Sequence, residues 1–328
     1  RRAALSERDR AERDAKGRAP DFADPQVLLA GADNTVESWL SVLESAREAT
    51  LSLAPEADRL RAVLTLTPTP DGAAALLSRE LVVGDAAPLL QMPAATGAAL
   101  LLRGDAQAGG AGPNVGESVA QLFGGRLNAE QSARLVKTFE AFSKSRRVAT
   151  VFGFLPGPAP ALLVSCELAE GGDFSQAFGD VLSLLELPPV SGFLAGSIGK
   201  PSLRFSKSDS GARHARIQFR PSVGGPALPL PKSLNVSWET EAGVGHIVVS
   251  PDALLGLSPF GDGARLAQVP WLSRSQPDMA GKTALGLLVD SRLLAPGGPD
   301  DAKLPLSFGK QDAQIVVALD VASAALPA

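Results

Sequence analysis

The sequence predicts an α+β fold made of internally duplicated helix-strand-turn-helix-strand units, with mainly antiparallel sheets and helices packed on one face. The first observation is a ten-residue phrase, G-D-x-x-x-L-L-x-apolar-P, which occurs at 84–93 and again at 179–188. The second is an apolar run closed by two prolines, which occurs at 63–70 and again at 151–158. Because patterns that recur in a fixed order are typical of repeated architectures, we expect residues 35–105 and 128–200 to form two related units.

The first 23 residues alternate positive and negative charges and contain no apolar stripe. A segment with nothing to bury is expected to be a solvated helix or a flexible tether. A basic tether beside a membrane anchor is the functional alternative. The globular part of the chain is then expected to begin at residue 24.

In the first unit, apolar residues at helical spacing, including Trp39, Leu40 and Leu43, predict an amphipathic helix over 35–53. Apolar and polar residues alternate over 60–66, which predicts a strand that the following prolines end. A further strand is expected over 98–102.

The second unit repeats this order. A helix with its body at 133–142 is expected to start near Asn128, and 148–154 is expected to be a strand. The stretch 148–166 has no charged residue and is long enough to span a membrane. Its central prolines and glycine would break a helix, so we expect a buried β-hairpin there, and no membrane span within the chain.

The ten-residue phrase itself suits a folding role. Glycine lets the backbone turn before a helix, and the next residue, Asp85 or Asp180, is placed to cap the first turn. The leucine pair is expected to face the sheet and the final proline to end the helix. The phrase therefore predicts a structural repeat rather than a ligand site.

The last third of the chain contains more predicted strands than the rest. Expected strands cover 215–219, 234–238, 246–249, 283–289 and 314–319. The prolines at 221–232 predict a connector, so 24–220 is expected to form the duplicated region and 233–328 a β-rich subdomain. Residues 266–270 resemble part of the phrase and suggest a degenerate third repeat.

Composition excludes several function classes. The net charge of −4 and the pI of about 5.4 do not fit a protein with a large nucleic-acid-binding face. The single cysteine, Cys166, lies in an apolar run and is expected to be buried and unreactive. Abundant alanine, glycine, proline and arginine are typical of a protein from a GC-rich bacterium.

Candidate catalytic residues are few. His214 and His246 are the two histidines, and no zinc-binding spacing surrounds them. Both are expected to be solvated, and we expect no metal or cofactor. Ser197 lies in a variant of the G-x-S-x-G nucleophile motif, but Lys200-Pro201 directly follows it and leaves no room for the supporting helix. No catalytic, cofactor-binding or metal-binding residue is therefore assigned.

The recurring helix, strand, proline turn and L-L-x-x-P, followed by the strand at 315–320, resembles uncharacterised exported proteins and lipoproteins of GC-rich bacteria. The resemblance covers about residues 35–320. It implies an extracytoplasmic location, in the periplasm or at the outer membrane, with a possible lipid anchor upstream; a cytoplasmic location is the alternative. We therefore expect a non-enzymatic envelope protein that binds a protein partner or an apolar ligand.

Two alternatives remain at this stage. One is a serine hydrolase that uses Ser197 with His214 or His246. The other follows from a second resemblance, to the duplicated α+β scaffold of pitrilysin-type metallopeptidases, whose catalytic copy carries H-x-x-E-H. That motif is absent from this sequence, so the resemblance implies a non-catalytic partner protein.

Overall fold

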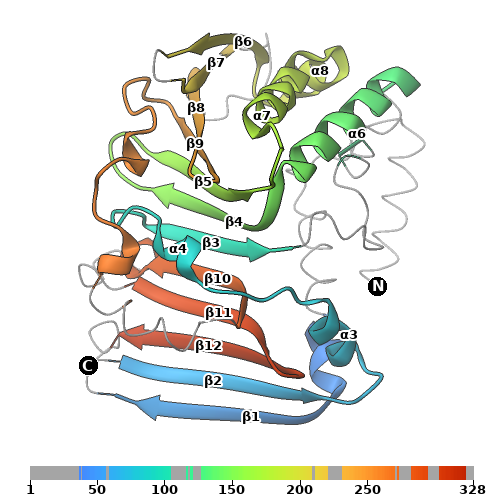
Figure 1. Ribbon diagram of the computed structural model, residues 1–328, viewed down its shortest axis with the longest axis vertical. Helices are drawn as coiled ribbons and strands as arrows, with labels where there is room; N and C mark the ends of the chain where they lie inside the picture. Colours follow the sequence, from blue (N-terminus) through green and yellow to red (C-terminus); the bar gives the residue numbers. More distant parts are fainter. Residues whose placement is uncertain are drawn as a thin grey trace.

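The computed structural model describes residues 37, 39–56, 59–104, 116, 119–120, 127–208, 211–220, 231–269, 272, 282–294 and 303–322. Its centre is one open sheet of twelve strands, all paired antiparallel, in the order β1-β2-β12-β11-β10-β3-β4-β5-β9-β8-β7-β6 (Figure 1). The strands are β1 (Ala46–Pro55), β2 (Arg59–Pro68), β3 (Ala98–Arg103), β4 (Arg146–Leu155), β5 (Ala161–Leu168), β6 (Lys200–Lys207), β7 (Arg213–Arg220), β8 (Ser233–Glu241), β9 (Val244–Ser250), β10 (Thr283–Asp290), β11 (Lys303–Gln311) and β12 (Gln314–Ala322). The predicted α+β class and the antiparallel pairing are confirmed.

Within the described residues, six α-helices accompany the sheet, apart from a short stretch before β1. They are α3 (Ala73–Glu80), α4 (Ala87–Leu90), α6 (Ala129–Lys144), α7 (Phe174–Ser183), α8 (Pro188–Ser197) and α10 (Ser291–Leu294). Three single turns of 3₁₀ helix, η1 (Leu184–Glu186), η2 (Ser258–Phe260) and η3 (Leu266–Gln268), complete the elements. A further helical stretch covers 39–44.

The sheet divides into two halves with the same strand order. One half reads β1-β2-β12-β11-β10-β3 and the other β4-β5-β9-β8-β7-β6. Along the chain, each half begins with a hairpin, β1–β2 or β4–β5, and helices follow the hairpin. Four further strands come next, and each of them pairs with the one before it: β3, β10, β11 and β12 in one half, and β6, β7, β8 and β9 in the other. The second half is continuous in sequence and lies between β3 and β10, so the first half is interrupted by it.

Most of the strands predicted from alternating apolar and polar residues, or from short apolar runs, are present in the sheet. The hairpin of β4 and β5 occupies the uncharged stretch at 148–166, with Leu155 opposite Ala161 at its turn. Helix α6 begins where expected, because the Asn128 side chain accepts from the backbone of Gln131 while the Gln131 side chain accepts from the backbone of Asn128. Strands β1 and β11 were not predicted.

The helix predicted over 35–53 is wrong in its second part. Among its described residues, the helix ends at Glu44 and β1 begins at Ala46. The Ser45 hydroxyl donates to the Val42 carbonyl and accepts from the backbone of Ala74, which ends the helix beside α3. Pairing of β1 with β2 along ten residues then replaces the local helical periodicity.

The predicted roles of the ten-residue phrase are also partly wrong. Asp180 lies inside α7, whose cap is Asp173, and α4 has no side-chain cap after Asp85. Pro188 starts α8 instead of ending a helix. The leucine pairs do pack inward, since Leu89 and Leu90 are buried in one apolar cluster and Leu184 and Leu185 pack in two others. The two copies therefore occupy different local structures.

The connector predicted at 221–232 lies mostly outside the described residues. Strands β7 and β8, on either side of it, pair with each other in the same sheet. The predicted division at this point, and the charged segment at 1–23, stay predictions.

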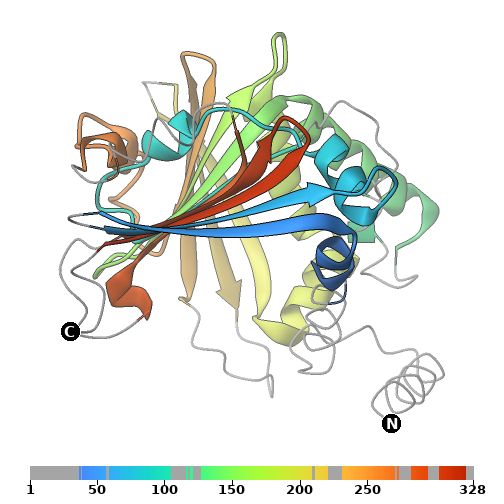
Figure 2. The same cartoon turned by 90° about the horizontal axis from the view of Figure 1, so that it is seen from below.

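Helices lie mainly, but not wholly, on one face of the sheet. We call this face the rear face; it carries Leu100, Phe152 and Val164 and is covered at its ends by α3 and by α6 and α7. The opposite, front face is covered by α4, η3 and the segment around Leu255. The prediction that helices pack on one face alone is thus corrected by α4. Figure 2 shows the strong twist of the sheet between these coverings.

Candidate apolar binding face

Large apolar side chains that are exposed on strands all lie on the rear face. Strand pairing fixes their direction, since directly paired residues point to the same side of a sheet. Within the described strands they are Leu51, Leu53, Leu102, Phe152, Phe154, Leu162 and Phe205. Single exposed apolar residues are ordinary, but a gathering on one face indicates a binding surface.

One row of paired residues crosses ten strands of the rear face without a polar side chain. From β1 to β8 it consists of Leu53, Ala62, Leu319, Leu306, Leu287, Leu100, Phe152, Val164, Ile247 and Trp238. The next row is equally apolar from β11 to β7: Leu304, Val289, Ala98, Phe154, Leu162, Val249, Val236 and Ala215. A continuous apolar floor is the result.

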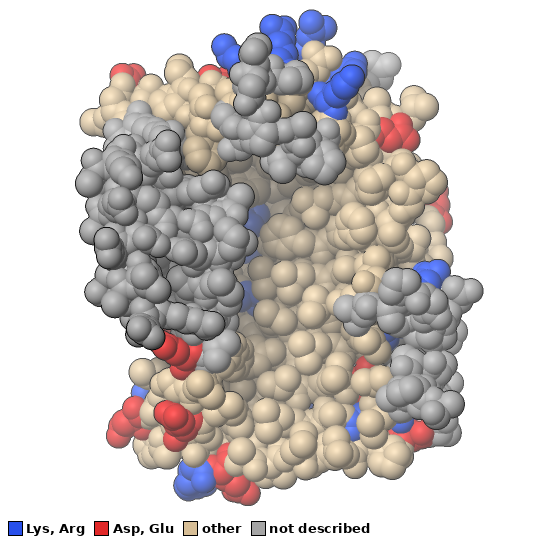
Figure 3. Space-filling view, turned by 180° about the vertical axis from the view of Figure 1, so that it is seen from behind, with Lys and Arg blue, Asp and Glu red and all other residues tan. Residues whose placement is uncertain are grey.

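Among the described elements, helices bury this floor only towards its two ends. Beneath α6 and α7, Trp238 and Cys166 are buried, and beside α3, Leu66 and Ile315 are buried. Between these ends, Phe152, Phe154 and Leu162 are 36%, 40% and 45% exposed. Figure 3 shows the middle of this face as a hollow lined mostly by uncharged side chains.

The front face of the same strands is closed. There Leu101, Val151, Leu163 and Leu288 are fully buried beneath α4 and its neighbours. These strands are therefore well packed on their front face, and their apolar side chains are exposed on the rear face alone.

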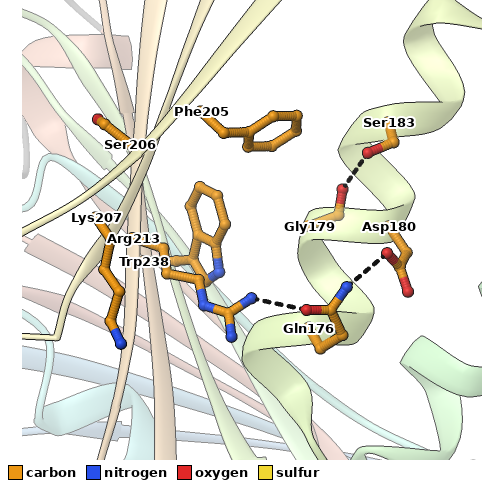
Figure 4. Close-up of a pocket in the computed structure, with 9 residues that line it drawn as sticks. All are labelled: Gln176, Gly179, Asp180, Ser183, Phe205, Ser206, Lys207, Arg213 and Trp238. Carbon is orange, nitrogen blue, oxygen red and sulfur yellow. Dashed lines mark hydrogen bonds between the residues drawn. The ribbon is translucent and has the colours of Figure 1, made fainter.

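A smaller and more polar cavity of about 460 Å³ lies between α7 and the β6–β7 hairpin. As Figure 4 shows, Arg213 reaches Gln176, whose amide in turn donates to Asp180 at 2.8 Å. Trp238 and Phe205 form its aromatic wall, with ring centroids 6.4 Å apart. Three of its polar side chains, Arg213, Gln176 and Asp180, are thus bonded in a chain.

The structure does not bring the candidate hydrolase residues together. Ser197 is the last residue of α8, just before β6, whereas His214 lies opposite Ser206 near the other end of β6. Ser206 lies six residue steps along β6 from Lys200, which is about 20 Å. The arrangement does not favour a hydrolase that pairs Ser197 with His214.

The two imidazoles are less solvated than the sequence suggested. His214 Nδ1 lies 2.8 Å from Ser237 Oγ and shares a hydrogen bond with it. The ring of His246 stacks on Phe260 with centroids 4.2 Å apart. Burial lowers the pKa of His246, with nearby Arg265 acting in the same direction and Glu241 opposing it. Both histidines are partly buried because neighbouring strands and η2 pack beside them, which the sequence could not reveal.

Cys166 is buried, as predicted. Burial raises the pKa of its thiol to about 12, against the opposing effect of Arg146 and of a hydrogen bond to the Gly245 carbonyl. A thiol that stays protonated is a poor nucleophile and metal ligand. Among the described residues, no group of three or more His, Cys, Asp and Glu side chains is placed to hold a metal ion.

Comparison with known proteins gives no relative: no protein-family model, curated protein or solved structure matches the chain. In the described part of the chain no single helix has the length and apolarity of a membrane span, although the bent pair Phe174–Glu186 and Pro188–Ala195 passes on both counts together.

The residues of the open face were not predicted from the sequence. The predicted burial of the β4–β5 hairpin holds for Val151 and Leu163 but is wrong for Phe152, Phe154 and Leu162. The available signal was that both faces of these strands are apolar. Strands that are apolar on both faces are expected to have both faces covered by other elements. In the described structure, other elements cover the front face of these strands completely and the rear face in part.

Proposed function

We propose that the protein is a non-enzymatic binding protein that holds the hydrocarbon part of an elongated apolar molecule, such as an acyl chain, on the rear face of its sheet. The observation that carries this proposal is the uninterrupted apolar row through Leu100, Phe152 and Val164, with Phe152, Phe154 and Leu162 exposed beside it.

The chemistry of the floor favours a hydrocarbon over a protein partner. A protein interface normally forms about one hydrogen bond per 100–200 Å². On the same face of β4, the Thr150 side chain is buried and lies 3.4 Å from an Arg146 nitrogen. An acyl chain requires no such bonds and gains about 0.8 kcal/mol for each CH₂ that it buries.

Binding of a fluorescent 16-carbon fatty acid tests the proposal. In a Phe152→Thr/Phe154→Thr variant we expect the affinity to fall about tenfold or more, because two aromatic contacts are lost while β-branched residues preserve the strand. Leu254→Thr is the matched control, since Leu254 is 94% exposed in a loop away from the strands. Failure of the wild-type protein to bind, or an equal loss in the control, would reject a hydrocarbon ligand.

We also propose an extracytoplasmic location for this protein, which is supported by the resemblance to exported proteins. Fusion to reporters that are active only on one side of the inner membrane tests it. Activity of the cytoplasmic reporter alone would contradict the assignment.

We also propose that the two halves of the sheet arose by duplication. Support comes from their identical strand order and from the shared order of hairpin, helices and four successively paired strands. In this proposal, the second copy was inserted between β3 and β10 of the first. Superposition of β4 to β9 on the six strands of the other half tests it, and opposite placement of the helices relative to the sheet would contradict it.

A further inference from the structure

The β6–β7 hairpin concentrates positive charge at one end of a protein that is negative overall. Its two strands carry six cationic residues and no acidic one: Lys200, Arg204, Lys207, Arg213, Arg216 and Arg220. All but Arg213 are exposed. Figure 3 shows Lys and Arg side chains gathered at the end of the molecule where β6 and β7 lie.

These cations lie directly opposite one another. Strand pairing places Lys200 against Arg220, Arg204 against Arg216, and Lys207 against Arg213. Like charges in directly paired positions destabilise a sheet. Within the described part of the chain, none of the six forms an ion pair, and Arg213 instead donates to Gln176. The hairpin therefore carries paired like charges. One of these pairs, Lys200 and Arg220, lines a pocket together with Glu186, whose carboxylate accepts from the Leu203 backbone at 3.0 Å.

The opposite edge of the sheet shows that an edge does not need this arrangement. There, β1 carries one cation and one carboxylate, Arg47 and Glu48. On its neighbour β2, Arg59 pairs with Glu56 at 2.8 Å, and both Arg59 and Arg61 approach Asp320, at 3.6 and 3.9 Å.

Protection of an edge against aggregation accounts for lysine and arginine on an edge strand such as β6. It does not account for the arginines of β7, because β7 is paired on both sides, with β6 and with β8. An external anion explains both strands, since it would relieve the repulsion between paired cations.

We propose that the β6–β7 hairpin docks the protein, edge on, to the surface of an anionic phospholipid bilayer. The cations gather on two strands at one extremity, with exposed Lys232 beside Phe219 of β7, which suits contact with a flat surface. A nucleic acid would instead need a basic track that continues over neighbouring strands. On β8, the charged side chains nearest to the hairpin are Glu239 and Glu241.

An exposed aromatic residue on the same edge strand agrees with this partner. Phe205 is half exposed and lies between Arg204 and Lys207 on β6. Phenylalanine is common on the apolar side of segments that lie at the boundary between lipid headgroups and hydrocarbon, and basic residues are attracted to anionic headgroups. If the hairpin docks edge on, side chains from both faces of β6 contact the bilayer surface.

Co-sedimentation of the full chain with vesicles tests the proposal. We expect binding to vesicles of phosphatidylcholine with about 30% phosphatidylglycerol, loss of binding to pure phosphatidylcholine, and strong weakening at about 0.5 M salt. In an Arg204→Gln/Arg216→Gln variant, partition should fall about 25-fold, because each basic residue near an anionic membrane contributes a factor of about five. Folding should be retained, since the change removes a repulsive pair.

The matched control is Arg134→Gln/Lys137→Gln, which removes two exposed charges from α6. It should bind like the wild-type protein. Equal binding to neutral vesicles, an equal loss in the control, or tighter binding to duplex DNA or an acidic polypeptide than to anionic vesicles would overturn the proposal. Fatty-acid binding by the hairpin variant is measured separately, so failure of membrane docking is distinguishable from failure of the hydrocarbon site.

Discussion

At the scale of single residues, His246 shows how packing changes a side chain's chemistry. Its ring stacks on Phe260, and Nδ1 is buried without a hydrogen-bond partner in the described structure. The pKa of His246 is lowered mainly by burial, so the folded protein favours the neutral imidazole. As the pH falls through the ordinary histidine pKa of 6.5, the unfolded chain takes up a proton before the folded chain does.

Stability should therefore decrease as the pH falls below 6.5. We predict that wild-type protein loses more unfolding free energy between pH 7.5 and pH 5.5 than a His246→Phe variant, as measured by urea denaturation. A Leu254→Thr variant, at an exposed loop position, should retain the wild-type loss. Identical pH dependence in wild type and His246→Phe would show that His246 does not cause it.

At the scale of secondary-structure elements, a buried ion pair ties β10 and β11 to the turn before β3. Lys303 Nζ lies 3.7 Å from Asp290 Oδ2 and donates to the Thr96 carbonyl at 2.7 Å, and both charged side chains are almost fully buried. Arg292 also contacts Asp290 at 2.7 Å. The hydrogen bond from Arg292 is the main reason that the pKa of Asp290 is lowered, with Lys303 contributing.

Asp290→Asn should cost about 3 kcal/mol of unfolding free energy, because it removes the charge of an almost fully buried carboxylate that contacts both Lys303 and Arg292. Asp262→Asn, in an exposed turn, should cost less than about 0.5 kcal/mol. Guanidinium denaturation of both variants measures the difference. Equal stability of the two variants would show that the buried pair does not hold these strands together.

At the scale of the whole molecule, one apolar cluster joins the two halves of the sheet. It includes Leu101 and Leu288 from one half and Val151, Leu163 and Val248 from the other. Because this front-face cluster straddles the β3–β4 junction, neither half has a complete core of its own.

The two halves should therefore unfold together. Leu101→Ala, at a fully buried position, should lower the unfolding free energy by about 2–5 kcal/mol and shift a single transition seen by both circular dichroism and tryptophan fluorescence. Leu254→Ala, at an exposed position, should leave the transition unchanged. Two separate transitions, only one of which moves in Leu101→Ala, would show that the halves are independent domains.

Local sequence patterns predicted correctly those elements that are fixed by residues within the element or next to it. The capping residues Asn128 and Gln131 located the start of α6, and the prolines after Leu155 located the β4–β5 turn. Local patterns failed where distant partners decide. The helical periodicity that continues beyond Glu44 gives way to pairing between β1 and β2, and the repeated phrase adopts two different structures in its two surroundings.

By itself, the sequence determined the α+β class, most strands, the hairpin at 148–166 and the burial of Cys166, because periodicity, proline and capping act within a few residues. Only the tertiary structure decided which apolar residues stay exposed. Phe152 and Val151 are neighbours in sequence, but one faces an open floor and the other a closed core. The reason is that coverage depends on where α4, α6 and α7 pack, and the opposition of cations across β6 and β7 likewise exists only through strand register.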